Sequence, residues 1–247
     1  MATSPAPVRL AAVADLHCGK IAPDFLRPLL TQVSSEADIL ALSGDLTDYG
    51  LPEEAETLAA ELSAVRIPIV AVLGNHDYQS DQQAAVREIL LNVGVKLLDG
   101  ESAEVHGIGF AGAKGFAGGF GTRTLEPWGE QAIKRFVQEA LDESLKLESA
   151  LARLRVPQRV ALLHYSPVQA TVEGEPAEIF CFLGSSRLEE PLNRYGATMV
   201  FHGHAHRGHL EGATQTGIPV YNVSLPLLRR TFPEGPLFRT FQIEVRE

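Results

Sequence analysis

The chain has 247 residues, 45% of them hydrophobic, which is enough to form one large domain with its own core. Its two cysteines imply no disulfide framework, and residues 1–7 lack the basic and apolar regions of a signal peptide. No apolar run approaches the roughly 20 residues of a membrane span. A formal charge of −10 argues against broad nucleic-acid binding, which needs Lys and Arg against phosphates. We therefore expect a single domain over residues 1–247, soluble and cytoplasmic.

The first hundred or so residues alternate short apolar runs with helical patterns, as in a mostly parallel sheet. Apolar runs predict strands at Val8–Ala14, Asp38–Leu42 and Ile67–Leu73. Apolar residues at helical spacing predict helices at Pro23–Ser35, Pro52–Val65 and Asp81–Asn92, the last of them stopped by Gly94.

The remainder of the chain is predicted to add further strands and one long amphipathic helix over residues 130–154. A short helix is expected at Leu188–Tyr195. The predicted strands are Val95–Leu98, Glu104–Phe110, Arg159–Leu163, Thr198–Phe201, Ile218–Val223 and Phe238–Val245. Two segments, 107–123 and 166–187, are expected to be irregular because glycine and proline recur in them.

Polar side chains follow several of these strands, at the point where each strand ends. In open α/β sheets, ligands bind at the carboxyl ends of the strands, so these side chains should meet. The residues concerned are Asp15, His17, Asp45, Asp48, Asn75, His76, Asp77, His164, His204 and His206. Carboxylate, amide and imidazole groups in one place predict a metal site.

In chain order the motifs are Asp-X-His, Gly-Asp-X-X-Asp, Gly-Asn-His-Asp, a lone His at a strand end and Gly-His-X-His, over residues 15–206. Together they resemble the signature of the calcineurin-like metallophosphoesterase superfamily. The resemblance implies an α/β fold, a four-layer α/β/β/α sandwich of two mixed sheets. It also implies a centre of two metal ions bridged by one carboxylate.

Carried over to this sequence, the resemblance implies two sets of ligands that share the bridging Asp45. The first ion would be held by Asp15, His17, Asp45 and His206, and the second by Asp45, Asn75, His164 and His204. This donor set suits manganese or iron, with zinc possible. Two ions roughly 3.5–4 Å apart can clamp the attacking and leaving oxygens of a phosphoryl transfer, and a hydroxide bridging them would be the nucleophile.

Other polar residues of these motifs lie outside the two implied ligand sets. His76 would stand beside the metals, where it could stabilise phosphoryl oxygens or protonate the leaving group. Asp48 and Asp77 either orient a ligand imidazole or cap the helix that follows. His202 is either a further ligand or a core residue, and Cys18 either lies near the metals or fills space.

The metal centre is shared across the superfamily, so it does not by itself choose the substrate. Among the branches of the superfamily, the Gly-Asn-His-Asp block places the chain close to the cyclic-nucleotide phosphodiesterases. The resemblance therefore implies a phosphodiesterase in preference to a phosphomonoesterase, acting on a small-molecule phosphate ester. The alternative is a non-catalytic, metal-dependent regulatory or binding protein on the same fold. We expect a monomer or a homodimer.

Substrate choice is expected to lie in the two irregular segments. Lys114, Arg123 and Arg187 either meet a substrate phosphate or are solvated loop charges. The aromatic residues there either stack on the substrate or anchor the loops; they are Phe116, Phe120, Phe180 and Phe182.

Overall fold

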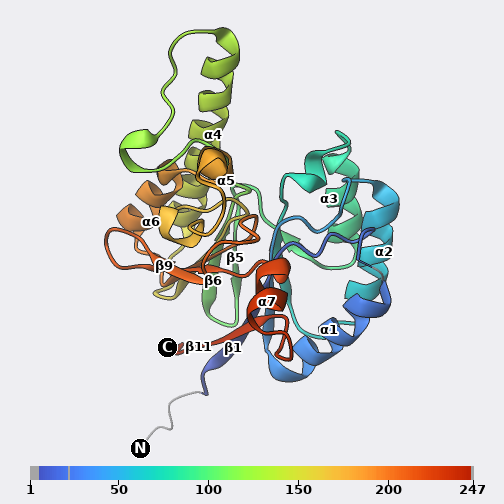
Figure 1. Ribbon diagram of the computed structural model, residues 1–247. Helices are drawn as coiled ribbons and strands as arrows, with labels where there is room; N and C mark the ends of the chain where they lie inside the picture. The colour runs from blue at the N-terminus through green and yellow to red at the C-terminus, as the bar shows by residue number, and fades with distance from the viewer. Residues whose placement is uncertain (1–5, 22, 246–247) are drawn as a thin grey trace, which may run out of the picture.

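The protein is described by a computed structural model over residues 6–21 and 23–245. Two sheets pack face to face, with helices on the outside of each (Figure 1). The first sheet has the order β11-β1-β2-β3-β4 and the second the order β5-β6-β7-β8-β10-β9. Both sheets combine parallel and antiparallel pairs. The predicted four-layer sandwich of two mixed sheets is therefore confirmed.

The strands of the first sheet are β1 (Val8–Val13), β2 (Ile39–Ser43), β3 (Ile69–Val72), β4 (Lys96–Leu97) and β11 (Arg239–Ile243). Those of the second are β5 (Ser102–Val105), β6 (Ile108–Gly112), β7 (Arg159–Leu162), β8 (Met199–His202), β9 (Glu211–Ala213) and β10 (Pro219–Asn222). The helices are α1 (Pro23–Glu36), α2 (Pro52–Leu62), α3 (Gln83–Asn92), α4 (Gln131–Arg153), α5 (Phe180–Leu183), α6 (Glu189–Tyr195) and α7 (Leu225–Thr231). Short 3₁₀ helices lie at η1 (His76–Tyr78), η2 (Gly121–Arg123), η3 (Gln169–Thr171), η4 (Ala177–Ile179) and η5 (Ser186–Leu188).

The alternation of side chains along the strands produces three apolar layers. In β1, Ala11 and Val13 pack with α1 to α3, whereas Leu10 and Ala12 face the second sheet. Phe110 and Phe201 fill that space between the sheets from the other side. A third cluster joins the outer face of the second sheet to α4 and α6. Every strand near the site is thus buried on both faces, which fixes its position firmly.

Some predicted elements were wrong in detail. The single strand expected over Glu104–Phe110 is a hairpin of β5 and β6, because His106 and Gly107 both adopt positive φ and turn the chain. Most of the glycine-rich start of segment 107–123 is therefore buried strand. Segment 166–187 contains four short helical elements, and β9 and α7 were not predicted.

One feature stands away from the sandwich. Residues 124–136, here called the arm, comprise a loop and the first turns of α4, and they project beyond both sheets (Figure 1). Residues 126–135 within it are all exposed. Within residues 6–21 and 23–245, none of the helices combines the length and apolar composition needed to span a bilayer.

Candidate metal centre

Backbone hydrogen bonds join the loop after β1 to the loop after β2, and the loop after β7 to the loop after β8. Asp15 N donates to Gly44 O at 3.0 Å, and His17 N donates to Asp45 O at 2.9 Å. Gly203 N likewise donates to His164 O at 3.2 Å. Because the loops are tied in pairs, the side chains at the strand ends converge on one place, as the sequence predicted.

The backbone bends sharply where these side chains leave it. Positive φ values are found at Asp15 (59°), His17 (42°), Asp45 (49°) and His204 (68°). Only two other described residues besides glycines, Asp81 and His106, share this feature. Left-handed backbone is uncommon for residues with a Cβ atom and concentrates at functional sites. Four of the predicted metal ligands therefore lie on strained backbone.

Two glycines are required by close approach. A Cβ atom on Gly74 would lie 2.2 Å from Asp45 Oδ1, and one on Gly203 would lie 2.3 Å from Asp15 Oδ2. Real Cβ atoms do not come so close to another heavy atom. Any other residue at either position would push the neighbouring carboxylate out of place.

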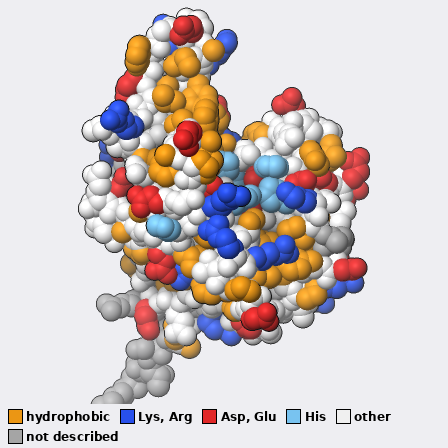
Figure 2. Space-filling model, in the orientation of Figure 1, with side chains coloured by type: hydrophobic (Ala, Val, Ile, Leu, Met, Phe, Trp, Pro, Cys, Tyr) orange, Lys and Arg blue, Asp and Glu red, His pale blue; other side chains and the backbone are white. Residues whose placement is uncertain are grey.

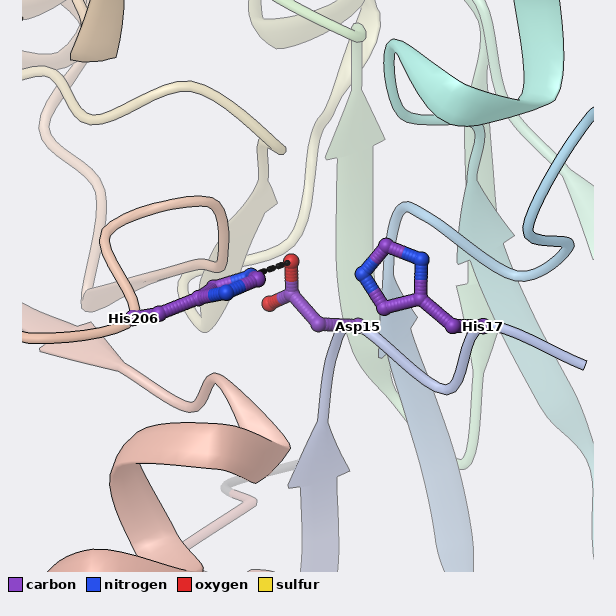
Figure 3. A group of neighbouring side chains, drawn as sticks. All are labelled: Asp15, His17 and His206. Carbon is purple, nitrogen blue, oxygen red and sulfur yellow. Dashed lines mark hydrogen bonds and ion pairs between the residues drawn. The ribbon is translucent and has the colours of Figure 1, made fainter. Parts of the chain in front are cut away.

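The first group of side chains centres on Asp15. Figure 3 shows its carboxylate between the rings of His17 and His206. His206 Nε2 lies 3.0 Å from Asp15 Oδ1, and the His204 amide donates to both carboxylate oxygens at 3.1–3.2 Å. Asp15, His17 and His206 each place one potential ligand atom within 4.8 Å of the others.

The second group centres on Asp45. His164 Nε2 lies 3.3 Å from Asp45 Oδ1 and 2.9 Å from Asn75 Oδ1. Asp45, His164 and His204 form another set with ligand atoms within 4.8 Å. His17 Nε2 is 3.8 Å from the other oxygen of Asp45, so this carboxylate lies between both groups. That is the position expected of a bridging ligand.

These residues fit a pair of metal ions. Neither ring nitrogen of the buried His17 makes a well-aligned hydrogen bond to a described residue, although the Asp48 carboxylate lies 3.2 Å from Nδ1. Nε2, which lies 3.8 Å from Asp45, is thus left open for another group to bind. Burial lowers the pKa of His17, and burial with the nearby His164 lowers that of His204 to about 4. Both imidazoles are thus neutral near pH 7, the form that binds metal.

The two carboxylates are held ionised. Burial alone would raise the pKa of Asp15, but the hydrogen bond from His206 and nearby imidazoles lower it below its usual value. Burial is likewise outweighed at Asp45, whose pKa is lowered by His164. In return Asp45 overcomes the effect of burial on His164 and raises its pKa to about 9. A cation in place of that proton would be stabilised by the same carboxylate.

His76 lies beside these groups, with its side chain 34% exposed toward the cleft. Its amide donates to Asp45 Oδ1 at 2.8 Å, and its Nδ1 donates to the carbonyl of Asp48 at 2.6 Å. The carboxylate of Asp48 lies 3.2 Å from His17 Nδ1. Asp48 therefore contacts two imidazoles and caps none of the described helices, and its role in orienting a ligand imidazole stays a prediction.

Asp77 has neither of the expected roles. Its buried carboxylate accepts hydrogen bonds from the amides of Leu46, Thr47 and Gly74 and from the Thr47 hydroxyl. Burial and the charge of Asp45 raise its pKa to about 6. Asp77 instead ties the loop after β2 to the loop after β3, and so supports both Asp45 and Asn75.

His202 points away from the centre. Its ring nitrogens contact Gly203 O and Thr171 Oγ1, both at 2.8 Å, and burial lowers its pKa to about 4. Asn222, which sequence reasoning missed, donates from Nδ2 to Ala205 O at 2.7 Å between the two histidines of the last motif. It ends β10 just as the predicted ligands end their strands, and this position could have revealed it.

Lys114, Arg187 and Cys18, which were candidates for a position near the substrate or the metals, make contacts outside the metal centre. Lys114 is buried among the rings of Tyr78, Phe116 and Tyr165. Arg187 donates to Leu125 O at 3.0 Å and so anchors the arm. Cys18 packs in the apolar layer under α1 to α3, so it fills space.

Arg123 lies exposed in η2. The aromatic residues of segments 107–123 and 166–187 divide into buried and exposed side chains. Phe120 is buried and Phe116 and Phe180 partly so, as expected of loop anchors. Phe182 is 54% exposed and its carbonyl lies 3.1 Å from His204 Nε2.

The fold has counterparts among solved structures. A phosphopantetheinyl hydrolase from Mycobacterium tuberculosis matches with a TM-score of 0.68 and 15% identity, covering 97% of each chain. TT1561 of Thermus thermophilus matches with a TM-score of 0.55 and 15% identity, covering 97% of this chain and 100% of that one. GAP50, the anchor in the inner membrane complex of Plasmodium, matches at 0.54 and 14%, covering 90% and 73%. At these identities the likeness concerns the fold alone.

No curated protein matches the sequence. The model of the calcineurin-like phosphoesterase family, however, matches residues 8–208, a stretch that contains every predicted ligand. That stretch is most of the chain, and it runs from the first strand of the first sheet to the last histidine of the centre. The chain therefore belongs to the calcineurin-like phosphoesterase family.

Proposed function

We propose that this protein is a di-metal-dependent phosphoester hydrolase that acts on phosphodiesters in preference to phosphomonoesters. The observation that carries the proposal is the position of Asp45 between two groups of potential ligand atoms, each within 4.8 Å of one another. The proposed ligands of one ion are Asp15, His17, Asp45 and His206, and those of the other are Asp45, Asn75, His164 and His204. Manganese or iron best suits these donors, and zinc is the alternative.

When bound, such ions stabilise charge on phosphoryl oxygens and make water a strong nucleophile near neutral pH. The protein's own groups bind and orient. The Asp48 carbonyl fixes the ring of His76 through Nδ1, which leaves Nε2 free to hold a proton near a phosphoryl or leaving-group oxygen. Asp77 keeps the loops of Asp45 and Asn75 in register.

The preference for a diester has one structural support. A phosphomonoester carries between one and two negative charges near pH 7, whereas a diester carries one. Lys114 and Arg187, two of the loop cations considered for substrate binding, are engaged with aromatic rings and with the arm. A singly charged phosphate places less demand on such side chains.

The first test is hydrolysis of bis-p-nitrophenyl phosphate beside p-nitrophenyl phosphate, in chelated protein resupplied with Mn²⁺. We expect faster turnover of the diester and none by chelated protein. Preference for the monoester would contradict the proposed specificity. Metal binding without turnover of either ester would favour the non-catalytic, metal-dependent binding protein.

A second arm of the assay concerns the natural substrate. Because a structural neighbour is named a phosphopantetheinyl hydrolase, we include coenzyme A and 4′-phosphopantetheine as substrates. Release of 4′-phosphopantetheine from coenzyme A would extend the proposal to a phosphoanhydride, because the bond hydrolysed joins two phosphates. Release of phosphate from 4′-phosphopantetheine would show activity on a monoester. The expected cytoplasmic location and the monomeric or homodimeric state remain predictions, to be checked by cell fractionation and sedimentation.

A further inference from the structure

An apolar surface leads from the metal centre onto the arm. It is formed by Ile133, Phe136 and Phe182, here called the apolar wall. Ile133 is 41% and Phe182 54% exposed, although both are large hydrophobic residues. Figure 2 shows hydrophobic side chains covering this face of the arm and reaching down to the histidines. Contiguous apolar surface of this kind on a soluble protein commonly marks a binding site.

The wall is connected to the metal centre by two routes. The carbonyl of Phe182 contacts His204 Nε2 at 3.1 Å, and the ring of Phe182 meets that of Phe136 at a centroid distance of 6.4 Å. By the second route, Phe136 packs on Phe116 at 4.9 Å, Phe116 on Tyr165 at 5.8 Å, and Tyr165 on His204 at 4.5 Å. The wall therefore begins at a proposed metal ligand.

Ile133 continues the wall outward. It lies three residues before Phe136, so the two share one face of α4. Leu145, also on α4 and 59% exposed, lies nine residues after Phe136, which is half a turn away around the helix. The apolar face toward the centre is thus distinct from the exposed leucine on the other side of the same helix.

The side of the cleft opposite the apolar wall is positively charged. Figure 2 shows Lys and Arg side chains gathered directly below the histidines, on the side away from the arm. Exposed Arg207 follows His206, and exposed Lys20 lies three residues after His17. The cleft is therefore apolar on one side and cationic on the other, with the metal centre between them.

From this division we propose that the apolar wall holds the hydrocarbon portion of an amphiphilic phosphodiester while its phosphate lies at the metal centre. The inference rests on the proposed function and names a substrate class for it. The side chains of the wall carry no hydrogen-bonding groups, so they recognise an alkyl or acyl chain by burial and not a nucleobase by its edges. His76 remains available to the leaving group. Lys114 and Arg187 are engaged elsewhere, so the exposed Lys20 and Arg207 of the cationic side are the cations that would meet the single charge of a diester.

The test uses p-nitrophenyl phosphodiesters whose second group is methyl or octyl, with the Mn²⁺-loaded protein. Each fully buried methylene contributes roughly fourfold to binding, so partial burial of the octyl chain should raise kcat/KM by at least about tenfold over methyl. Ile133→Ser should reduce this octyl-to-methyl ratio severalfold. Leu145→Ser, at another exposed hydrophobic residue of α4 that lies half a turn from Phe136, should leave the ratio unchanged. A ratio cancels any general loss of activity.

A binding measurement separates this inference from the proposed function. Calorimetry should show octylphosphonate binding the metal-loaded protein more tightly than methylphosphonate, with a negative heat-capacity change, and less so in Ile133→Ser. If neither diester is hydrolysed, the proposed function fails while this measurement still tests the wall. Equal affinities together with a flat ratio would overturn the wall's role. So would a dimer in sedimentation that Ile133→Ser dissociates, because the wall would then be an interface between copies.

Discussion

The two sheets contribute different chemistry to one centre. The first supplies both carboxylates and the amide, in Asp15, Asp45 and Asn75, whereas the second supplies only imidazoles. Each carboxylate of the first sheet contacts an imidazole of the second, since His206 lies 3.0 Å from Asp15 and His164 lies 3.3 Å from Asp45. The charge of the centre thus comes from one half of the chain and much of its geometry from the other. Neither half contains the site alone.

The largest effect is expected from removing Asp45, the carboxylate that lies between the two groups of ligands. Asp45→Ala should abolish metal binding and turnover together, because both proposed ligand sets share this carboxylate, which lies 3.8 Å from His17 and 3.3 Å from His164. Metal content by mass spectrometry and diester hydrolysis are the measurements. Asp81→Ala is the control, since Asp81 is an exposed aspartate that also has positive φ (58°). Two metal ions retained in Asp45→Ala would disprove its bridging role.

His76 tests whether the first sheet also supplies a group that acts without holding metal. His76→Ala should keep both ions yet lower kcat by about 10²–10⁴-fold, the usual contribution of a positioned acid or base. Steady-state kinetics beside metal analysis will show this. His209→Ala, at an exposed histidine after the last motif, should change neither. An unaltered kcat in His76→Ala would exclude the proposed role.

Asn222 tests the contribution of the second sheet to geometry. Asn222→Leu removes the donor to Ala205 O between His204 and His206, and loss of such supporting contacts commonly weakens metal affinity by about 10–100-fold. Competition with a metal-sensitive dye measures the affinity. Asn193→Leu removes an amide of α6 that bonds Thr216 and serves as the matched control. Equal metal affinities in the two variants would mean that the loop of His204 and His206 keeps its conformation without Asn222.

The smallest expected effect concerns Asp38, a carboxylate that directly precedes β2 and lies outside the metal centre. The side chain of Arg9, and then its amide, hydrogen-bond to Asp38 and lower its pKa. Asp38 therefore stabilises the fold above its ordinary pKa of about 3.9, and this contribution is lost as the pH falls through the lowered value.

Urea unfolding should accordingly show Asp38→Asn less stable than wild type from pH 7 to about pH 5. The difference should shrink below about pH 4, while the metal content of the variant stays that of wild type. Glu56→Gln, at an exposed position of α2, is the control. A difference that persists unchanged into acid would show that packing and not charge explains the effect.

The sequence was most informative where the two sheets meet. Strand ends marked by Asp15, Asp45, His164 and His204 could be predicted because an apolar run followed by a polar turn has one common meaning in α/β folds. The structure brings all the predicted ligands together, and their roles as ligands remain to be tested. What the motif could not show is which neighbours support them.

The missed features share a cause, which is that they depend on contacts distant in sequence. His202 looked like a ligand candidate, but its direction is set by Thr171, thirty-one residues away. The turn at His106-Gly107 needs a histidine in left-handed backbone, which sequence alone does not signal. By contrast, α7 begins with a proline at its first turn after Ser224, a pattern that could have been recognised.

The left-handed backbone at Asp15, His17, Asp45 and His204 has a consequence for how far this protein can be made heat-resistant. Glycine would adopt those angles with less strain, and like charges would no longer be crowded at Asp15 and Asp45. Selection for thermal stability alone would therefore be expected to erode the centre, one ligand at a time. At these four positions, the residues that would give the highest thermal stability therefore differ from the residues that the proposed metal centre requires.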